Sequence, residues 1–383
     1  MNPKLTAEIV KRFQDKFKTQ PLVLHSPGRI NLIGEHTDYN EGFVFPAAIN
    51  KGIVGAIQKA EKPYCTVIAN DLDEEYEFSL NTIKPIANGQ WRNFVVGVVG
   101  ELQKRGVELE PFNFVFGGDI PKGAGLSSSA ALENSVVFGL NELFSLGLSK
   151  KEMIEISQKA EHNYVGVRCG IMDQYASMFG EKDRALLLDC RTLKAKTYPL
   201  EFEDYQVMLI NTNVSHNLVD AEYNDRRDVC EKVAKLLNVN FLRDATKAML
   251  NSVKHQLSED EYQKALYIIQ ENERVLKAGK MLEEKNVFGF GELLFEAHHG
   301  AQHQFKISCK ELDFLVDEAR NNPLVIGARM MGGGFGGCTI NFVKAEAVNA
   351  FSEDISKKYR KAFKRECSIY FVELSQGTHL TNN

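Results

Sequence analysis

The sequence predicts an α+β protein of two domains, each of which mixes sheets with helices. Three observations lead to this prediction. The chain has 383 residues, which suits two domains of ordinary size better than one. Segments with helical periodicity and segments with the apolar runs or alternation of strands occur in both halves. Hydrophobic residues make up 44% of the chain and charged residues 25%, the average for globular proteins, so both domains can bury a core.

In the first half, the predicted order is a helix, then strands, then helices. Residues 6–17 place their apolar side chains on one helical face, and Thr6 is a candidate N-cap. Apolar or alternating runs predict strands at residues 22–24, 43–57, 66–68, 75–78 and 112–116. Helical periodicity predicts helices at residues 92–105, 127–144 and 150–164.

A polar stretch at residues 191–204 separates two further predicted strands, 185–189 and 206–211. We place the domain boundary in this stretch, with a first domain of residues 1–195 and a second of residues 196–383. The second domain is predicted to be mostly helical, with helices at residues 217–237, 259–282, 289–305, 312–321 and 345–363. Its later strands are predicted at residues 327–331, 339–343 and 368–372.

Charge excludes one large function class. Lys and Arg total 46 against 51 Asp and Glu, a net charge of -5, whereas a general nucleic-acid binder needs a basic excess for its phosphate contacts. An anionic small substrate needs only a local positive pocket, so the net charge does not argue against one.

The hydropathy pattern and the cysteines indicate a cytoplasmic protein. No apolar stretch reaches the roughly 20 residues that cross a bilayer, and charges interrupt the N-terminal segment throughout, so neither a membrane span nor a signal peptide is expected. The seven cysteines are odd in number and include no Cys-x-x-Cys pair. This argues against a disulfide framework or a structural zinc site and favours a reducing compartment.

Residues 118–133 carry the most informative pattern, a glycine–serine loop between a predicted strand and a long helix. Gly123 and Gly125 permit close backbone approach, and the serines at 127–129 sit where a helix leaves its first N–H groups unpaired. Those N–H groups and the helix dipole attract phosphate, and a serine hydroxyl is a suitable oxygen ligand for Mg²⁺. The alternative interpretation is a glycine turn followed by a serine N-cap, which needs one serine. The three serines present here therefore favour phosphate binding. No Gly-Lys-Ser/Thr occurs, so this is not a Walker A loop.

A second glycine run, residues 332–337, contains the spacing of a dinucleotide-binding fingerprint. That fingerprint needs a helix after it, but residues 338–343 have the pattern of a strand, so we reject a dehydrogenase. The two remaining interpretations are a hairpin turn and a loop whose backbone packs against the active site.

Residues 28–42 concentrate Arg, Glu, His, Asp and Asn between glycines. Such a density of hydrogen-bonding side chains suits a sugar, which presents donors and acceptors in fixed directions. Glu35, His36 and Asp38 are also possible metal ligands, but only if other ligands converge on them.

These segments resemble the motifs of a known superfamily. Residues 28–42 resemble the galactokinase signature, residues 123–129 the phosphate loop of the GHMP kinases (galactokinase, homoserine, mevalonate and phosphomevalonate kinases), and residues 331–338 their third motif. The motifs lie in the family's order and span nearly the whole chain, with Ala131 where the family often has Ser. The resemblance implies the two-domain GHMP kinase fold with the active site in the cleft between the domains. It also implies ATP as co-substrate, Mg²⁺, and phosphorylation of the anomeric hydroxyl of galactose to galactose 1-phosphate.

The resemblance also implies residue roles. The catalytic pair would be Arg29 and Asp173. Residues expected to contact the sugar are Glu35, His36, Thr37, Asp38, Gly170 and Tyr223. Residues expected to bind the nucleotide are Asn70, Trp91, Gly123, Ala124, Gly125, Leu126, Ser127, Ser128 and Ser129. The expected magnesium ligands are Ser129 and Glu161.

Without the resemblance, we would interpret Asp173 as a carboxylate stabilised at a helix N-terminus and Glu161 as a solvated side chain. Tyr223 and Trp91 would be interpreted as packing residues. Two other functions stay open. N-acetylgalactosamine kinase shares the first motif, and one sequence does not show the room beside the second carbon of the sugar. A damaged phosphate loop or a missing acid would favour a non-catalytic sensor of galactose and ATP. In this sequence the residues of the loop and the acid are all present. The expected partners are the sugar and ATP, with no nucleic acid and no membrane, and the expected state is a monomer.

Overall fold

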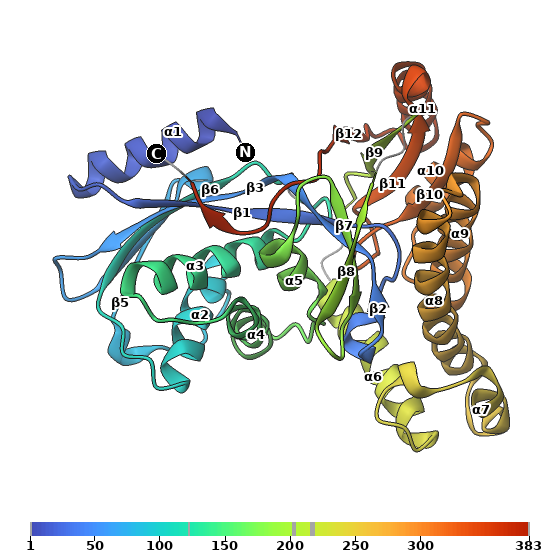
Figure 1. The fold of residues 1–383 in the computed structure, drawn as a ribbon, viewed down its shortest axis with the longest axis horizontal. Helices are drawn as coiled ribbons and strands as arrows, with labels where there is room; N and C mark the ends of the chain where they lie inside the picture. Colours follow the sequence, from blue (N-terminus) through green and yellow to red (C-terminus); the bar gives the residue numbers. More distant parts are fainter. Residues whose placement is uncertain (1, 122, 201–203, 215–218, 382–383) are drawn as a thin grey trace.

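The computed structural model describes residues 2–121, 123–200, 204–214 and 219–381, which form two lobes side by side along the long axis (Figure 1). The first lobe is built on a six-stranded sheet in the order β13-β1-β3-β6-β4-β5, in which only β4 and β6 pair in parallel. Its strands are β1 (Leu22–Asn31), β3 (Pro46–Lys59), β4 (Cys65–Ala69), β5 (Glu74–Phe78), β6 (Phe112–Gly118) and β13 (His379–Leu380).

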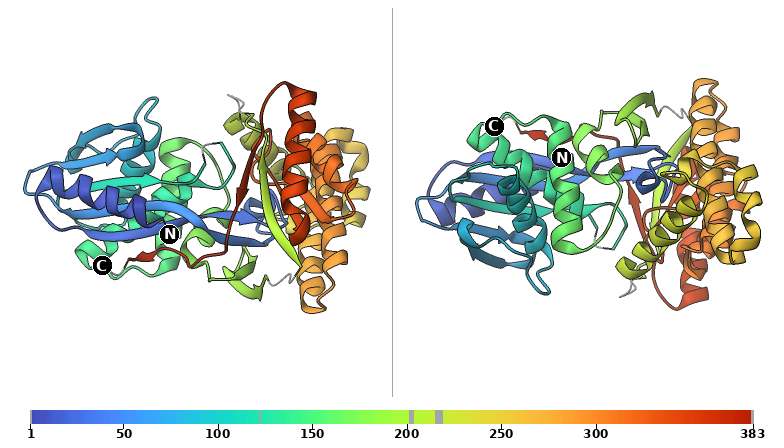
Figure 2. Two further views of the ribbon diagram at one scale, coloured as in Figure 1. Left: turned by 90° about the horizontal axis from the view of Figure 1, so that it is seen from above. Right: turned by 90° about the horizontal axis from the view of Figure 1, so that it is seen from below.

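Helices cover both faces of this sheet. Helix α1 (Pro3–Phe17) lies on one face, and α2 (Trp91–Lys104), α3 (Ser128–Phe144), α4 (Lys150–Ala160) and α5 (Met172–Phe179) lie on the other (Figure 1). In Figure 2, α1 crosses in front of the strands in the view from above, and the green helices lie in front in the view from below. The main core forms between the sheet and these four helices, where side chains such as Val95, Phe114 and Val136 are fully buried.

Two sequence predictions need correction here. Helix α1 begins at Pro3 and its N-cap is Asn2 and not Thr6, because Asn2 Oδ1 accepts hydrogen bonds from Lys4 N and Leu5 N and Pro3 fits the first turn without losing a bond. Strand β1 does not end at Leu24 but continues to Asn31, with an irregularity between Pro27 and Arg29 that accommodates the missing N–H of proline.

The second lobe is built on a four-stranded antiparallel sheet in the order β10-β11-β9-β12. Its strands are β9 (Tyr205–Asn211), β10 (Val325–Met330), β11 (Cys338–Lys344) and β12 (Ser368–Phe371). Its helices are α6 (Val219–Leu236), α7 (Lys247–Ser252), α8 (Glu259–Glu283), α9 (Val287–Gly300), α10 (Lys310–Arg320) and α11 (Val348–Phe363). The start of α8 follows from the sequence, since Ser258 and Glu261 form a reciprocal capping box. The first residues of the helix predicted from Asn217 lie outside the described residues.

A small sheet joins the two lobes. It contains β2 (Phe43–Val44), β7 (Arg184–Asp189) and β8 (Lys194–Pro199), in the order β2-β7-β8. The polar stretch in which we placed the domain boundary therefore contains a strand. The chain later returns to the first lobe, where Leu380 pairs with Leu24. The mixture of sheets and helices in both lobes confirms the predicted fold class, and the division at residue 195 stays a prediction.

The remaining helical turns are short. Two π-helical segments extend α4 and α9, namely η4 (Glu161–Val165) and η7 (Ala301–Phe305). The 3₁₀ turns are η1 (Asp38–Asn40), η2 (Asn70–Leu72), η3 (Leu80–Thr82), η5 (Leu242–Asp244), η6 (Lys254–Gln256) and η8 (Ala345–Ala347).

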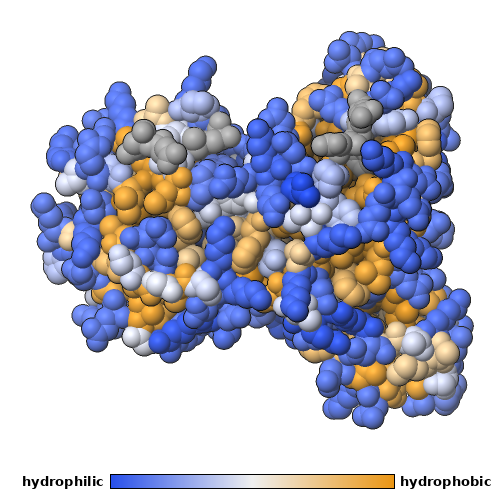
Figure 3. Space-filling model, in the orientation of Figure 1, coloured by the Kyte–Doolittle hydropathy of each residue, from blue (hydrophilic) through white to orange (hydrophobic). Residues whose placement is uncertain are grey.

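Hydrophilic side chains cover most of the face drawn in Figure 3, and the outline narrows between the lobes. Within the described ranges, none of the helices combines the length and hydropathy that a bilayer crossing requires. All seven cysteines are free thiols.

Candidate active site

A cavity of about 110 Å³ lies where the two lobes meet. Its walls come from β1 and the loop after it, from the segment between α4 and α5, from α6, and from the glycine run after β10. The lining residues are Arg29, Glu35, His36, Asp38, Glu161, Val167, Cys169, Gly170, Met172, Asp173, Tyr223, Gly332 and Gly333. The structure thus brings together both members of the predicted catalytic pair and most of the residues predicted to contact the sugar.

Arg29 and Asp173 form a two-pronged ion pair in this cavity. Arg29 Nε donates to Asp173 Oδ1 at 2.7 Å, and Nη2 donates to Oδ2 at 2.9 Å. Burial alone would lower the pKa of Arg29, but Asp173 and then Glu35 outweigh it and raise that pKa. Asp173 is the second residue of α5, where the helix dipole favours a carboxylate. The pair is therefore an organised charge site beside the cavity.

The glycine–serine loop is joined directly to this pair. Arg29 Nη1 donates to the carbonyl of Gly125 at 2.6 Å, and the backbone N–H of Arg29 donates to the carbonyl of Leu126 at 3.1 Å. Gly125 (φ +69°) and Ser127 (φ 58°) both have left-handed backbones, which bend the loop before α3 begins at Ser128. Ser127 Oγ donates to Asp173 Oδ2 at 2.5 Å. The sequence predicted nucleotide binding for Ser127 and missed this contact with the carboxylate.

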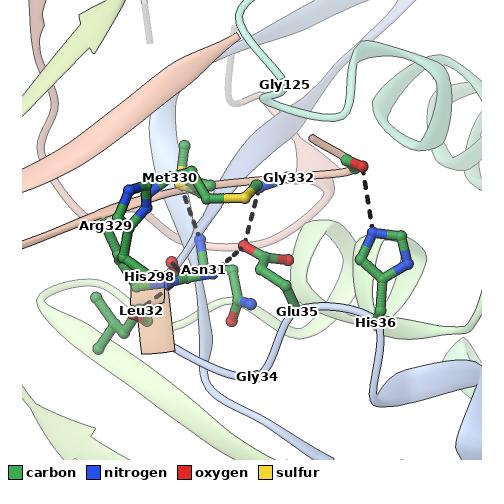
Figure 4. A network of polar contacts seen from close by, with 12 residues as sticks. Asn31, Leu32, Gly34, Glu35, His36, Gly125, His298, Arg329, Met330 and Gly332 are labelled. Atoms are coloured by element: carbon green, nitrogen blue, oxygen red, sulfur yellow. Dashed lines mark hydrogen bonds and ion pairs between the residues drawn. The ribbon is translucent and has the colours of Figure 1, made fainter. Parts of the chain in front are cut away.

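Glu35 is held by the second lobe (Figure 4). Its Oε1 accepts a hydrogen bond from Gly332 N at 2.9 Å and lies 3.0 Å from Nη2 of Arg329. Arg329, on β10, is only 1% exposed, and its Nη1 also donates to the carbonyls of Asn31 and Leu32. The glycine run therefore packs its backbone against the active site, which was one of the two interpretations of that run. Within the described part of the chain, Glu35 belongs to no group of three or more His, Cys, Asp or Glu side chains that could hold a metal ion, which argues against a metal role.

His36 is neutral, and its tautomer follows from its partners. Burial is the main cause that lowers its pKa to about 3. Its Nε2 lies 3.2 Å from the carbonyl of Gly333, which can only accept, so Nε2 carries the proton (Figure 4). Nδ1 then accepts from Tyr39 Oη at 2.9 Å. Because both ring nitrogens already have partners, the remaining contacts of the His36 ring are made by its faces. The centroid of the Tyr223 ring lies 4.7 Å from the centroid of the His36 ring.

Asp38 is a buried carboxyl that lines the same cavity as the Arg29–Asp173 pair. Burial, and then the charge of Asp173, raise its pKa from 3.8 to about 6. Its Oδ1 accepts from Tyr39 N at 2.9 Å, and its Oδ2 accepts from Met172 N at 3.4 Å. A Cβ placed on Gly170 would lie 2.0 Å from Asp38 Oδ2, so this position has no room for a side chain.

We expect Gly170→Ala to weaken the binding of a sugar in this cavity by at least about tenfold, because the added methyl displaces the Asp38 carboxylate from the cavity wall. Gly333→Ala is the matched control. It adds a methyl to the same cavity, but that methyl meets Tyr223 at an ordinary 3.5 Å. Calorimetric titration of both variants with the sugar measures the effect. Equal Kd values for the two would contradict the steric argument.

A second carboxylate of the cavity lining, Glu161, lies next to the buried carboxyl of Glu133. Burial, and then the charge of Glu161, raise the pKa of Glu133 well above its usual range. Glu133 Oε1 has no hydrogen-bond partner among the described residues, and Gln174 Nε2 donates to Glu161 Oε2 at 3.0 Å. Glu133 lies on α3, one helical turn after Ser129. Sequence reasoning missed Glu133, although a carboxylate among the apolar residues of α3 was a usable signal.

Ten predicted site residues do not line the cavity, namely the seven residues of the loop 123–129 together with Thr37, Asn70 and Trp91. Thr37 is fully buried, and its hydroxyl donates to the carbonyls of Gly34 and Phe43. Asn70 and Trp91 belong to the first lobe, where Asn70 Nδ2 donates to Glu8 and Trp91 Nε1 donates to Glu74 Oε2 at 2.7 Å. Arg329 was also missed in the sequence, where its only signal was a charge inside an apolar strand.

Known proteins match most of the chain. Residues 11–59 match the galactokinase galactose-binding signature, residues 93–181 the N-terminal domain of the GHMP kinases, and residues 280–361 their C-terminal domain. The chain is 39% identical over 360 residues to the galactokinase of Clostridium tetani, with 92% of each chain covered. It is also 39% identical over 352 residues to that of Thermotoga petrophila, covering 92% of this chain and 98% of the other.

Comparison with solved structures also finds a galactokinase. The galactokinase of Lactococcus lactis complexed with galactose superposes with a TM-score of 0.93 at 33% identity, covering 98% of this chain and 99% of the other. The mevalonate kinase of Methanococcus jannaschii shares the fold, with a TM-score of 0.66 at 18% identity and coverage of 94% and 100%.

Proposed function

The chain belongs to the galactokinase family of the GHMP kinases, and from this premise we propose that it transfers the terminal phosphate of ATP to the anomeric hydroxyl of galactose. The products are galactose 1-phosphate and ADP. The observation that carries the proposal is the Arg29–Asp173 ion pair, which lies between the sugar-signature loop and the glycine–serine loop.

We assign sugar binding to the side chains that line the cavity. Asp38, ionised above pH about 6, accepts hydrogen bonds from sugar hydroxyls, and Glu35 uses the oxygen that is not bound to Gly332. His36 and Tyr223 form an apolar wall against the sugar ring. Gly170 keeps the space beside Asp38 open. Thr37 acts indirectly, because its hydroxyl holds the shape of the loop.

We assign the nucleotide to the first lobe. The backbone of residues 123–129 and the N-terminus of α3 receive the phosphates. Trp91 and Asn70 are proposed to lie toward the nucleotide on the same lobe. Ser129 and Glu161 are the proposed Mg²⁺ ligands. The site suits a cation, because burial and the charge of Glu161 disfavour the ionised form of Glu133, which a cation would stabilise, and one oxygen of Glu133 is without a hydrogen bond among the described residues. Bound Mg²⁺ would offset phosphate charge.

In the proposed mechanism, Asp173 orients the anomeric hydroxyl and accepts its proton as the oxygen attacks the phosphorus. Arg29 holds the Asp173 carboxylate in place through two hydrogen bonds and offsets the negative charge that develops on the transferring group. Ser127 Oγ fixes the orientation of the carboxylate. We further propose that the protein works as a cytoplasmic monomer, and its seven free thiols suit a reducing compartment.

The test is ADP release with ATP and Mg²⁺ on galactose, N-acetylgalactosamine, glucose, mevalonate and homoserine. Turnover on galactose above the others is the expected result. Higher turnover on N-acetylgalactosamine than on galactose would overturn the assignment of galactose as the substrate. If no sugar is turned over while galactose still raises the Tm, the protein is a sensor and the kinase proposal is wrong.

Galactose binding should weaken as the pH falls through about 6. The folded protein holds the pKa of Asp38 near 6, so the carboxylate that accepts from the sugar is progressively lost below that value. Each pH unit below the pKa lowers the ionised fraction about tenfold, so between pH 7.5 and pH 5 the Kd should rise about tenfold. Calorimetry without ATP avoids the titration of the nucleotide. Asp38→Asn should bind weakly at every pH, and a flat profile for the unmodified protein would count against the role of Asp38.

A further inference from the structure

The second lobe carries another pocket, of about 740 Å³, between α8, α9, the 301–305 segment and α10. This volume falls within the range of small-molecule sites. Its lining residues include Gln270, Arg274, Glu296, His299, Gln304 and Arg320. Among the described residues, none lines both this pocket and the sugar cavity.

Two guanidinium groups, those of Arg274 and Arg320, line the pocket together with the carboxylate of Glu296. The pKa of His299 is lowered by burial first and then by neighbours that include Arg320 and Arg274. Arg320 is exposed, and its guanidinium lies over the ring of Phe295 at 4.4 Å from the centroid. Arg274 is 8% exposed, and its Nη2 is buried without a hydrogen-bond partner among the described residues. Because Nη2 is closed to solvent in this conformation, an anion in the pocket would reach it after a shift of the Arg274 side chain and would then supply the missing acceptor.

The rest of the lining suits hydroxyl groups. Gln304 Nε2 donates to Gln263 Oε1 at 3.3 Å and to Gln270 Oε1 at 3.0 Å, so three amides form a row along one wall. Glu296 adds a carboxylate acceptor. The lining residues include no Phe, Tyr or Trp on which a nucleotide base would stack. Guanidinium groups on one side and amides on the other match a molecule with one anionic group and several hydroxyls.

We propose that this pocket binds a phosphorylated sugar and that its occupancy changes the affinity for galactose. The phosphate contacts Arg274 and Arg320, and the hydroxyls contact the amides and Glu296. The link to the active site is a chain of short contacts. Arg274 Nε donates to Glu271 Oε2 at 2.6 Å, and Glu271 Oε1 accepts from Gly34 N at 2.9 Å. Gly34 precedes Glu35 in the loop assigned to the sugar, and Tyr267, beside Arg274, donates to the Glu35 carbonyl at 3.3 Å.

A ligand that draws Arg274 away from Glu271 loosens the support of Gly34 and Glu35. The expected kinetic signature is a KM for galactose that rises by at least about threefold with little change in kcat, because the ion pair Arg29–Asp173 is not part of this chain. This coupling rests on the proposed function, whereas binding to the pocket does not.

Binding is tested by calorimetry on the full chain with galactose and ADP present at saturation, so that the active site is occupied. The probes are galactose 1-phosphate, glucose 6-phosphate and inorganic phosphate. At least one sugar phosphate should bind about tenfold more tightly than inorganic phosphate. Arg320→Gln and His299→Gln should weaken this binding about tenfold, and Lys277→Gln, an exposed position on α8 outside the pocket, should not. No binding of either sugar phosphate, equal binding of inorganic phosphate, or no effect of Arg320→Gln would overturn the site.

Initial rates separate this proposal from the kinase assignment. Without any sugar phosphate, Arg320→Gln and Lys277→Gln should phosphorylate galactose at the unmodified rate. Absence of turnover in all three proteins would overturn the proposed function and leave the calorimetric result standing. With the bound sugar phosphate added, the KM should rise in the unmodified protein and in Lys277→Gln but not in Arg320→Gln. An unchanged KM in all three would overturn the coupling.

Discussion

Asp173→Asn is expected to lower kcat for galactose by about 10²- to 10⁴-fold, the contribution typical of a general base, while galactose binding changes little. The asparagine keeps the shape of the side chain and one oxygen that can accept from Arg29 Nε. It removes the negative charge and the site that receives the hydroxyl proton. Calorimetry with galactose and single-turnover rates with ATP measure binding and chemistry separately.

The control is Asp183→Asn. Asp183 lies in the exposed turn after α5 and has a left-handed backbone (φ 60°) that asparagine tolerates. This variant should retain normal kcat and KM. Near-normal turnover by Asp173→Asn would remove Asp173 from the catalytic role, and a lost heat of galactose binding would mean that the ion pair shapes the sugar site instead.

Arg329→Met is expected to lower the free energy of unfolding by about 3–5 kcal/mol, the effect of breaking a buried ion pair, and to weaken galactose binding. Arg329 and Glu35 are 1% and 2% exposed at their side chains. Without the guanidinium, the Glu35 carboxylate stays buried with only Gly332 N bound to Oε1, and the carbonyls of Asn31 and Leu32 lose a donor. Urea unfolding measures the stability, and calorimetry measures the binding.

Two comparisons make this result interpretable. Arg360→Met removes a surface arginine that pairs with Glu366 and should lower stability by at most about 1 kcal/mol. The double variant Glu35→Gln with Arg329→Met should regain part of the stability, because no unpaired charge remains, but should still bind galactose poorly. If Arg329→Met is no less stable than Arg360→Met, the buried pair does not hold the sugar loop.

The sequence by itself predicted those features that depend on neighbours along the chain. The helix starting near residue 259 was predicted from its helical periodicity, and the structure shows that a Ser258–Glu261 capping box begins it. The rejection of a dehydrogenase followed from the strand pattern after residue 337, where β11 lies. The glycine–serine loop could be predicted as a phosphate site because glycines and a helix N-terminus act through the local backbone, and its phosphate binding stays a prediction. The roles predicted for Asp173 and Tyr223 depended on the resemblance. Nothing in their own segments distinguished Asp173 from a capping carboxylate or Tyr223 from a packing residue.

The tertiary structure decided which side chains meet. Arg29 and Asp173 are 144 positions apart, and their ion pair exists because β1 and the start of α5 pack together. The structure also shows that Ser127 contacts that carboxylate. A backbone carbonyl holds Thr37, and a buried arginine holds Glu35. Glu133 lies close to Glu161. The physical reason is that an ion pair or a pKa shift depends on distance and burial. Periodicity shows which face of an element is apolar, but only packing brings residues far apart in the chain within a few ångströms in a medium from which water is excluded.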